Sequence, residues 1–235
     1  MKLNNKRTIL VGLAFLSICA FWQMYDSIVP LILTKTFHMN ETFSGAIMAA
    51  DNILALFLLP FFGSVSDKSH SKLGKRMPFI LFGTGCAIIL MNILPLLDNS
   101  YAAQPSGFKT ASFVIVLGLL LVAMGTYRAP AVALMPDVTP KPLRSRANAI
   151  INLMGAVGGI LYLGVAAVLY PNSKTAGVEH VNYQPLFIVV SAIMFVAVAV
   201  LFLTIREPKL TAENQALEKP VSYTHLRAHE TPEHL

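Results

Sequence analysis

The chain has 235 residues, of which 55% are hydrophobic and 13% are charged, and its formal net charge is +6. A soluble domain usually carries about a quarter charged residues, so this composition argues against one and favours a membrane protein. The positive charges flank apolar runs and form no patch, which argues against nucleic-acid binding. The two cysteines both lie inside apolar runs, so the sequence predicts no disulfide framework and no metal site.

Six apolar runs are long enough to cross a bilayer as helices, each of which needs about 20 residues. We expect spans at about 9–33, 43–64, 78–97, 112–135, 147–170 and 185–205. The first run is too long for a cleaved signal peptide and is expected to remain as a span. Residues 1–208 are therefore predicted to form one all-α membrane domain of six helices. Pro78 and Pro185 are expected to open helices, and Pro208 is expected to stop the last one.

Lysine and arginine gather in alternate loops. Twelve of them form four clusters, at Lys2, Lys6 and Arg7, at Lys68, Lys72, Lys75 and Arg76, at Lys141, Arg144 and Arg146, and at Arg206 and Lys209. The intervening loops carry one lysine each, Lys35, Lys109 and Lys174. Cytoplasmic loops are enriched in these residues, so both termini are expected to face the cytoplasm from a plasma or inner membrane.

Residues 209–220 are polar and are expected to form a cytoplasmic linker. The following stretch, VSYTHLRAHETPEHL at 221–235, does not have zinc-site spacing, because His229 and His234 are five residues apart and Pro232 would break the helix. We interpret it as a translated cloning adaptor, and we therefore expect the chain to be a fragment of a longer protein.

The loop between the second and third predicted spans carries the strongest motif. Its members are Gly63, Asp67, Lys68, Gly74, Lys75 and Arg76. A glycine at a helix end allows another helix to approach, and an aspartate there can pair with basic residues in one conformation and release them in another. A merely solvated basic loop would explain the lysines and arginine but not the glycine and aspartate spacing.

This motif resembles the signature between the second and third helices of major facilitator superfamily transporters. The sequence Ser66 to Lys68, followed by GKRMPF at 74–79, is most similar to the sugar–cation symporter branch. A second block, YRAPAVALMPDVTP at 127–140 followed by Arg144 to Asn148, resembles the fourth helix, inner loop and fifth helix of that group. Lys68 and Lys75 stand where arginine is usual, and lysine cannot make the forked contacts of arginine.

The resemblance implies a twelve-helix fold of two halves, with the substrate site between them near the middle of the membrane. This chain would be the N-terminal half, and a C-terminal half of six helices would be its missing partner. The resemblance also implies secondary transport of a sugar or glycoside, coupled to a proton or sodium ion. Asp67 and Arg76 would gate the cytoplasmic side, together with the cluster at Asp137 and Arg144.

Three ionisable residues, Asp26, Asp51 and Arg128, lie inside predicted spans, where charge is costly and usually functional. Gln23 and Trp22 precede Asp26 by three and four residues and are expected to share its face. A carboxylate, an amide and an aromatic ring suit the hydroxyls and apolar face of a sugar. Each of these residues could instead make only structural contacts between helices.

The fifth span carries a stripe of small and polar residues with helical spacing: Asn148, Asn152, Gly155, Gly159 and Tyr162. The glycines are expected to allow close helix packing, and Asn152 could line the pathway.

No P-loop and no nucleophile–base pair is apparent, so we predict no cofactor and no enzymatic activity. Two alternatives to a transporter remain open, a membrane sensor or assembly partner on the same fold, and an inert truncated product. The gene sequence beyond codon 220 would separate them.

Overall fold

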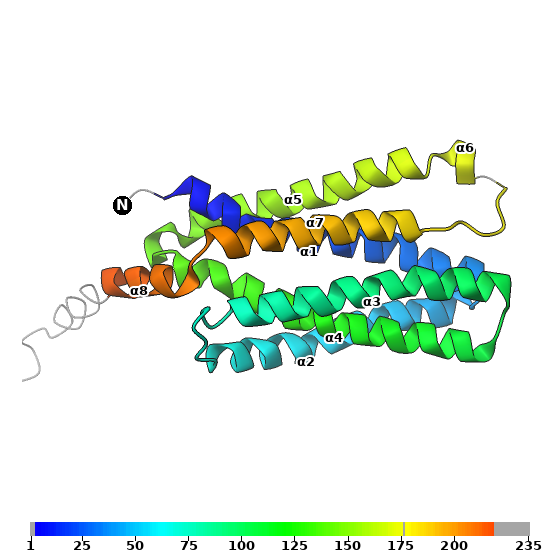
Figure 1. Cartoon of the computed structure of the whole chain (residues 1–235), viewed down its shortest axis with the longest axis horizontal. Helices are drawn as coiled ribbons and strands as arrows, with labels where there is room; N and C mark the ends of the chain where they lie inside the picture. The colour runs from blue at the N-terminus through cyan, green and yellow to red at the C-terminus, as the bar shows by residue number, and fades with distance from the viewer. Residues whose placement is uncertain (1–2, 176, 219–235) are drawn as a thin grey trace, which may run out of the picture.

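The computed structural model describes residues 3–175 and 177–218, and the regular elements in these ranges are all helical (Figure 1). Six of the described helices are long and apolar enough to cross a membrane, which confirms the predicted all-α fold with six spans. They are α1 (Asn5–Leu31), α2 (Glu41–Asp67), α3 (Met77–Ala103), α4 (Gly107–Val138), α5 (Arg144–Leu169) and α7 (Gln184–Thr204). The shorter elements are the π-helix η1 (Ile32–Thr36), the 3-10 helix η2 (Lys141–Leu143), α6 (Asn172–Thr175) and α8 (Glu207–Glu218).

The six long helices lie side by side along the long axis of the molecule (Figure 1). One end of the bundle holds the start of α1, the α2–α3 loop, η2 and α8, and most of the basic clusters lie there; we call it the basic end. The other end, which we call the opposite end, holds η1, the α3–α4 loop and α6 (Figure 1).

The helix limits follow local sequence signals. The side chains of Asn4 and Asn40 cap α1 and α2 by accepting backbone N–H groups at 3.1 Å. Pro78 and Pro185 lie in the first turns of α3 and α7, as expected. The expectation for Pro208 is wrong, because α7 ends at Thr204 and Pro208 lies in the first turn of α8. A first-turn residue needs no N–H donor, so proline is accepted there.

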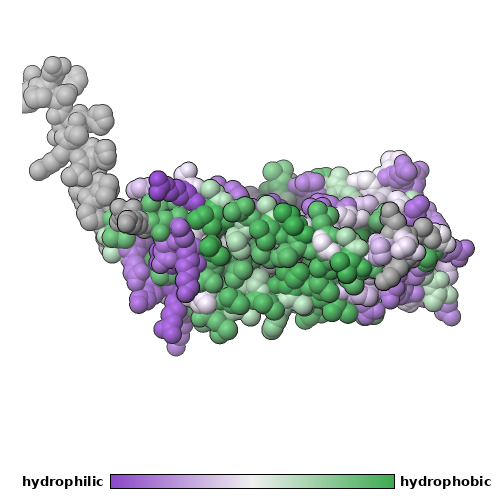
Figure 2. Space-filling view, turned by 90° about the horizontal axis from the view of Figure 1, so that it is seen from above, coloured by the Kyte–Doolittle hydropathy of each residue, from purple (hydrophilic) through white to green (hydrophobic). Residues whose placement is uncertain are grey.

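Residues 209–218, part of the predicted linker, therefore belong to a helix. The predicted adaptor, at 221–235, lies outside the described residues. Figure 2 shows apolar residues across the middle of the visible face and hydrophilic residues toward both ends, as expected for a membrane-spanning bundle.

Helix α1 lies at the centre of the bundle, because 61% of an 18-residue apolar stretch of its span is buried, whereas none of the corresponding stretch of α2 is. The Tyr127 hydroxyl of α4 lies 2.6 Å from Ser17 Oγ and donates to the Ala14 carbonyl at 3.1 Å, which joins α4 to α1.

Glycines allow α5 to approach α1. A Cβ at Gly155 would lie 2.9 Å from Cys19 Sγ, and a Cβ at Gly158 would overlap the backbone oxygen of Leu16. A Cβ at Gly159 would only reach Gln23 Oε1, at 3.9 Å. The predicted packing role therefore holds for Gly155, but the closest approach is at Gly158, which the predicted stripe did not include.

Candidate functional site

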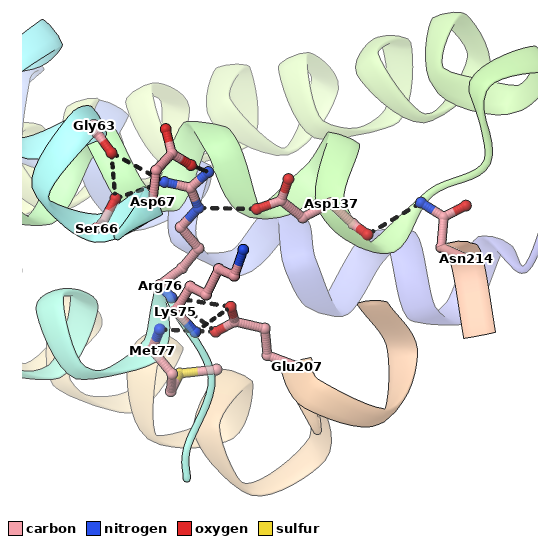
Figure 3. Close-up of polar contacts among 9 residues, drawn as sticks. All are labelled: Gly63, Ser66, Asp67, Lys75, Arg76, Met77, Asp137, Glu207 and Asn214. Carbon is pink, nitrogen blue, oxygen red and sulfur yellow. Dashed lines mark hydrogen bonds and ion pairs between the residues drawn. The ribbon is translucent and has the colours of Figure 1, made fainter. Parts of the chain in front are cut away.

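Arg76 binds two other helices at the basic end. It occupies the N-cap position of α3, and its side chain is only 6% exposed. Its Nε donates to Asp137 Oδ2 of α4 at 2.9 Å, and another guanidinium nitrogen pairs with Asp67 of α2. The third nitrogen donates to Ser66 Oγ at 2.6 Å and to the Gly63 carbonyl at 3.3 Å (Figure 3). The forked guanidinium thus joins α2 and α4 to the start of α3.

Glu207, the first residue of α8, caps the start of α3. This buried carboxylate accepts the backbone N–H groups of Lys75 at 2.7 Å, Arg76 at 2.9 Å and Met77 at 2.9 Å (Figure 3). Helix N-termini leave such donors unpaired and favour negative charge, so the contact is stabilising. Gly74 has a φ of +112°, and a Cβ there would overlap the Glu207 side chain, so both the turn and the close approach require glycine.

The structure brings together only part of the predicted gate motif. Lys68 is exposed at the end of α2, and Lys75 takes part in the Glu207 contact through its backbone. Arg144 donates from Nε to the Thr139 carbonyl at 3.1 Å. A Cβ at Gly63 would meet no atom within 4 Å, so within the described residues this glycine is not needed for helix approach.

Sequence reasoning missed Glu207 and Asn214. The Asn214 side chain donates to the carbonyls of Asp137 and Thr139, at 3.1 and 3.2 Å, and so holds α8 against the end of α4 (Figure 3). The one available signal was the dipeptide Glu207–Pro208, since acidic residues and proline are both favoured in the first turn of a helix.

A second group of predicted residues meets within the spans of α1, α2 and α4. The Arg128 guanidinium carbon lies 5.6 Å from the centre of the Trp22 ring, within the range of a cation–π contact. Trp22, Asp51 and Arg128 line one cavity of about 20 Å³, which is close to the size of one water molecule. Trp22 Nε1 and Asp51 Oδ1 are buried there with no hydrogen-bond partner among the described residues.

The remaining predicted pathway residues lie apart from this cavity. Gln23 and Asp26 are exposed on α1, and Asn152 is exposed on α5. Trp22, by contrast, is half-buried and faces α4. The predicted α1 face is therefore divided: Trp22 lines the small cavity with Asp51 and Arg128, whereas Gln23 and Asp26 lie on the exposed surface of the bundle.

The comparisons with known proteins agree with this architecture. Residues 11–232 match the family described as the Major Facilitator Superfamily. The chain belongs to this superfamily. Its six spans correspond to one six-helix half of the major facilitator fold, as the sequence predicted.

Individual relatives within the superfamily cover part of the chain. Sucrose transport protein SUC3 of Arabidopsis thaliana is 35% identical over 158 residues, which are 62% of this chain and 26% of that protein. Sucrose transport protein SUT3 of Oryza sativa subsp. indica is 36% identical over 154 residues, 60% of this chain and 30% of that protein. Alpha-ketoglutarate permease of Escherichia coli is 25% identical over 179 residues, 75% of this chain and 38% of that protein. The chain thus spans about a quarter to two fifths of the length of these relatives.

Proposed function

We propose that the chain forms one half of a secondary active transporter that moves a sugar or glycoside across a membrane by alternating access. The observation that carries this proposal is the meeting of Trp22, Asp51 and Arg128 inside the spanning segments. Placing an ionisable group inside a membrane-spanning segment is energetically costly, and in membrane proteins such groups usually mark a substrate or ion pathway. Major facilitator transporters place their substrate site between two six-helix halves near the midplane, and the halves rock around it.

The basic end would face the cytoplasm, because its loops hold most of the lysine and arginine residues. In this orientation the contacts of Arg76 with Asp67 and Asp137 would form a cytoplasmic gate. They hold α2, α3 and α4 together in this conformation, and opening toward the cytoplasm would require some of them to break.

A sugar is favoured as the substrate for two reasons. Relatives at 35% and 36% identity are named as sucrose transport proteins. Trp22 offers an aromatic ring, and Gln23 and Asn152 offer exposed amides that can donate to and accept from hydroxyl groups. Asp26, an exposed carboxylate on the same helix as Trp22, would carry the coupling proton or bind the coupling sodium ion.

A dicarboxylate is the second candidate substrate. The alpha-ketoglutarate permease matches a larger share of the chain, 75%, although at lower identity. Arg128 inside a span would suit a carboxylate, because the guanidinium can bind both of its oxygens.

Uptake into vesicles that contain the full-length protein tests the proposal. Labelled sucrose, maltose and α-ketoglutarate should each be offered with an inward proton gradient, an inward sodium gradient or neither. Gradient-driven accumulation of a sugar would support the first proposal, and accumulation of α-ketoglutarate alone would replace it with the second. Protein-free vesicles set the background, and background uptake of all three solutes under every gradient would contradict both.

A further inference from the structure

A fully buried carboxylate lies at the opposite end of the bundle. Asp98, in the last two turns of α3, is 0% exposed, and neither of its oxygens has a hydrogen-bond partner among the described residues. An ionised carboxylate that is removed from water without a donor is strongly unfavourable. Its charge state must therefore depend on the groups that face it.

Within the described part of the chain, three groups from outside α3 face Asp98. His180, in the segment between α6 and α7, places Nε2 at 3.9 Å from Asp98 Oδ2. Thr36 at the end of η1 and Tyr183 just before α7 lie near enough to influence the charge of the carboxylate, although neither has the geometry of a hydrogen bond to it. His180 is the basic group of this set, so it is the one that can supply a neutralising charge.

The hydrogen bonds around His180 fix one of its protons. Asn182 Oδ1 accepts the backbone N–H of Gln184 at 2.9 Å, so the Asn99 amide nitrogen, also at 2.9 Å, must donate to it. Asn99 Oδ1 is then an acceptor, and its contact of 2.8 Å with His180 Nε2 requires a proton on that nitrogen.

The second ring nitrogen can be protonated or not. His180 Nδ1 lies 3.3 Å from Thr36 Oγ1, and a hydroxyl can either donate to or accept from that nitrogen. The Thr36 hydroxyl can therefore accompany either form of the ring, by donating to a bare Nδ1 or by accepting from a protonated one. A cavity of about 650 Å³ lined by Thr36 and His180 gives protons from solvent a route to the ring.

We propose that Asp98 and His180 form a proton-binding site that fastens residues 177–183 to the ends of η1 and α3. In addition to the fixed proton on His180 Nε2, the pair can hold one more proton. If Asp98 holds it, both groups are uncharged, and if His180 Nδ1 holds it, the two groups form an ion pair. Loss of that proton leaves a buried carboxylate beside a neutral ring, which weakens the attachment. Residues 177–183 are therefore held against the ends of η1 and α3 at low pH and are released as the pH rises. This site is independent of the proposed transport pathway.

Hydrogen exchange in the 235-residue chain in detergent micelles tests this proposal. Exchange of the peptide spanning residues 178–184 is followed from about pH 5 to about pH 9, the range in which histidine titrates, after correction for the intrinsic exchange rate. Protection should fall by about tenfold or more across this range. In Asp98→Asn, which resembles the protonated acid, protection should stay high at every pH.

His38→Asn is the matched control, because His38 is an exposed histidine that lines the same cavity. It should keep the pH profile of the unaltered chain. A flat profile in the unaltered chain, or the unaltered profile in a folded Asp98→Asn, would overturn the proposal. If Asp98→Asn does not fold, NMR of the unaltered chain decides, with the His180 ring nitrogens and the Asp98 carboxyl carbon followed together. One of these two groups must lose a proton over the pH range in which the exchange changes, and titration of neither would also overturn the proposal.

Discussion

Arg76 Nε donates to Asp137 Oδ2 at 2.9 Å while another nitrogen of the same guanidinium pairs with Asp67. Asp67 and Asp137 belong to α2 and α4, which are 70 residues apart along the chain at these positions. One side chain thus connects two helix ends to a third. Lysine could make one of these contacts but not all of them, since it has no planar fork.

Replacement of Arg76 by alanine should lower the free energy of unfolding by about 1–3 kcal/mol. The expected loss is smaller than for a fully buried pair, because Asp67 and Asp137 are 61% and 31% exposed and can be rehydrated. Arg76→Lys should lie between alanine and arginine. Denaturant unfolding in detergent measures all three, and Lys68→Ala, at an exposed lysine in the same loop, is the control. Equal stability of Arg76→Ala and Lys68→Ala would show that the contacts contribute nothing.

Replacement of Glu207 by alanine should destabilise the start of α3 by about 0.5–2 kcal/mol, the usual cost of losing a helix cap. Glu207→Gln should cost less, because the amide oxygen can still accept the backbone N–H groups although its charge is lost. Hydrogen exchange at residues 75–77 is the specific measurement, since these N–H groups bind the carboxylate. Glu213→Ala, at an acid of the same helix whose side chain is 51% exposed, should leave exchange there unchanged; an equal effect of both variants would count against the cap.

Replacement of Gly158 by alanine should destabilise the bundle by about 1–3 kcal/mol, because the new methyl group overlaps the Leu16 backbone of α1. Gly164→Ala on the same helix should be neutral or stabilising by up to about 1 kcal/mol, because nothing lies within 4 Å of its Cβ position. Thermal unfolding of the two variants side by side checks the prediction. A Gly158→Ala variant as stable as Gly164→Ala would mean that α1 and α5 do not approach this closely.

Trp22 and Arg128 should be energetically coupled by about 0.5–2 kcal/mol, the range of cation–π contacts from exposed to desolvated sites. A double-mutant cycle with Trp22→Leu and Arg128→Gln measures this coupling through the free energy of unfolding. The pair Trp22→Leu and Lys209→Gln is the control, because Lys209 is an exposed residue of α8. Additive effects in the first cycle would show that Trp22 and Arg128 do not interact energetically.

The spans were predictable because length and hydropathy decide which segments cross a bilayer. The helical state of residues 207–218 was not predictable, because Glu207 binds Arg76, which lies 131 residues earlier, and Asn214 binds Asp137, which lies 77 residues earlier. The pairing of Asp67 with Arg76 followed from their shared loop, whereas the second pairing, with Asp137, depends on how α4 packs. Spacing along α1 placed Trp22 with Gln23 and Asp26, but the packing of α4 turns Trp22 toward Arg128 and leaves the other two exposed.

The most direct test of the transport proposal compares Asp26→Asn with the unaltered full-length protein in vesicles. Two activities are measured on the same preparation: gradient-driven accumulation of a labelled sugar, and exchange of labelled for unlabelled sugar without a gradient. If Asp26 carries the coupling ion, Asp26→Asn should lose accumulation to the level of empty vesicles but keep exchange. Accumulation at the unaltered level in Asp26→Asn would contradict the assignment of Asp26, and the absence of both activities from the unaltered protein would contradict sugar transport itself.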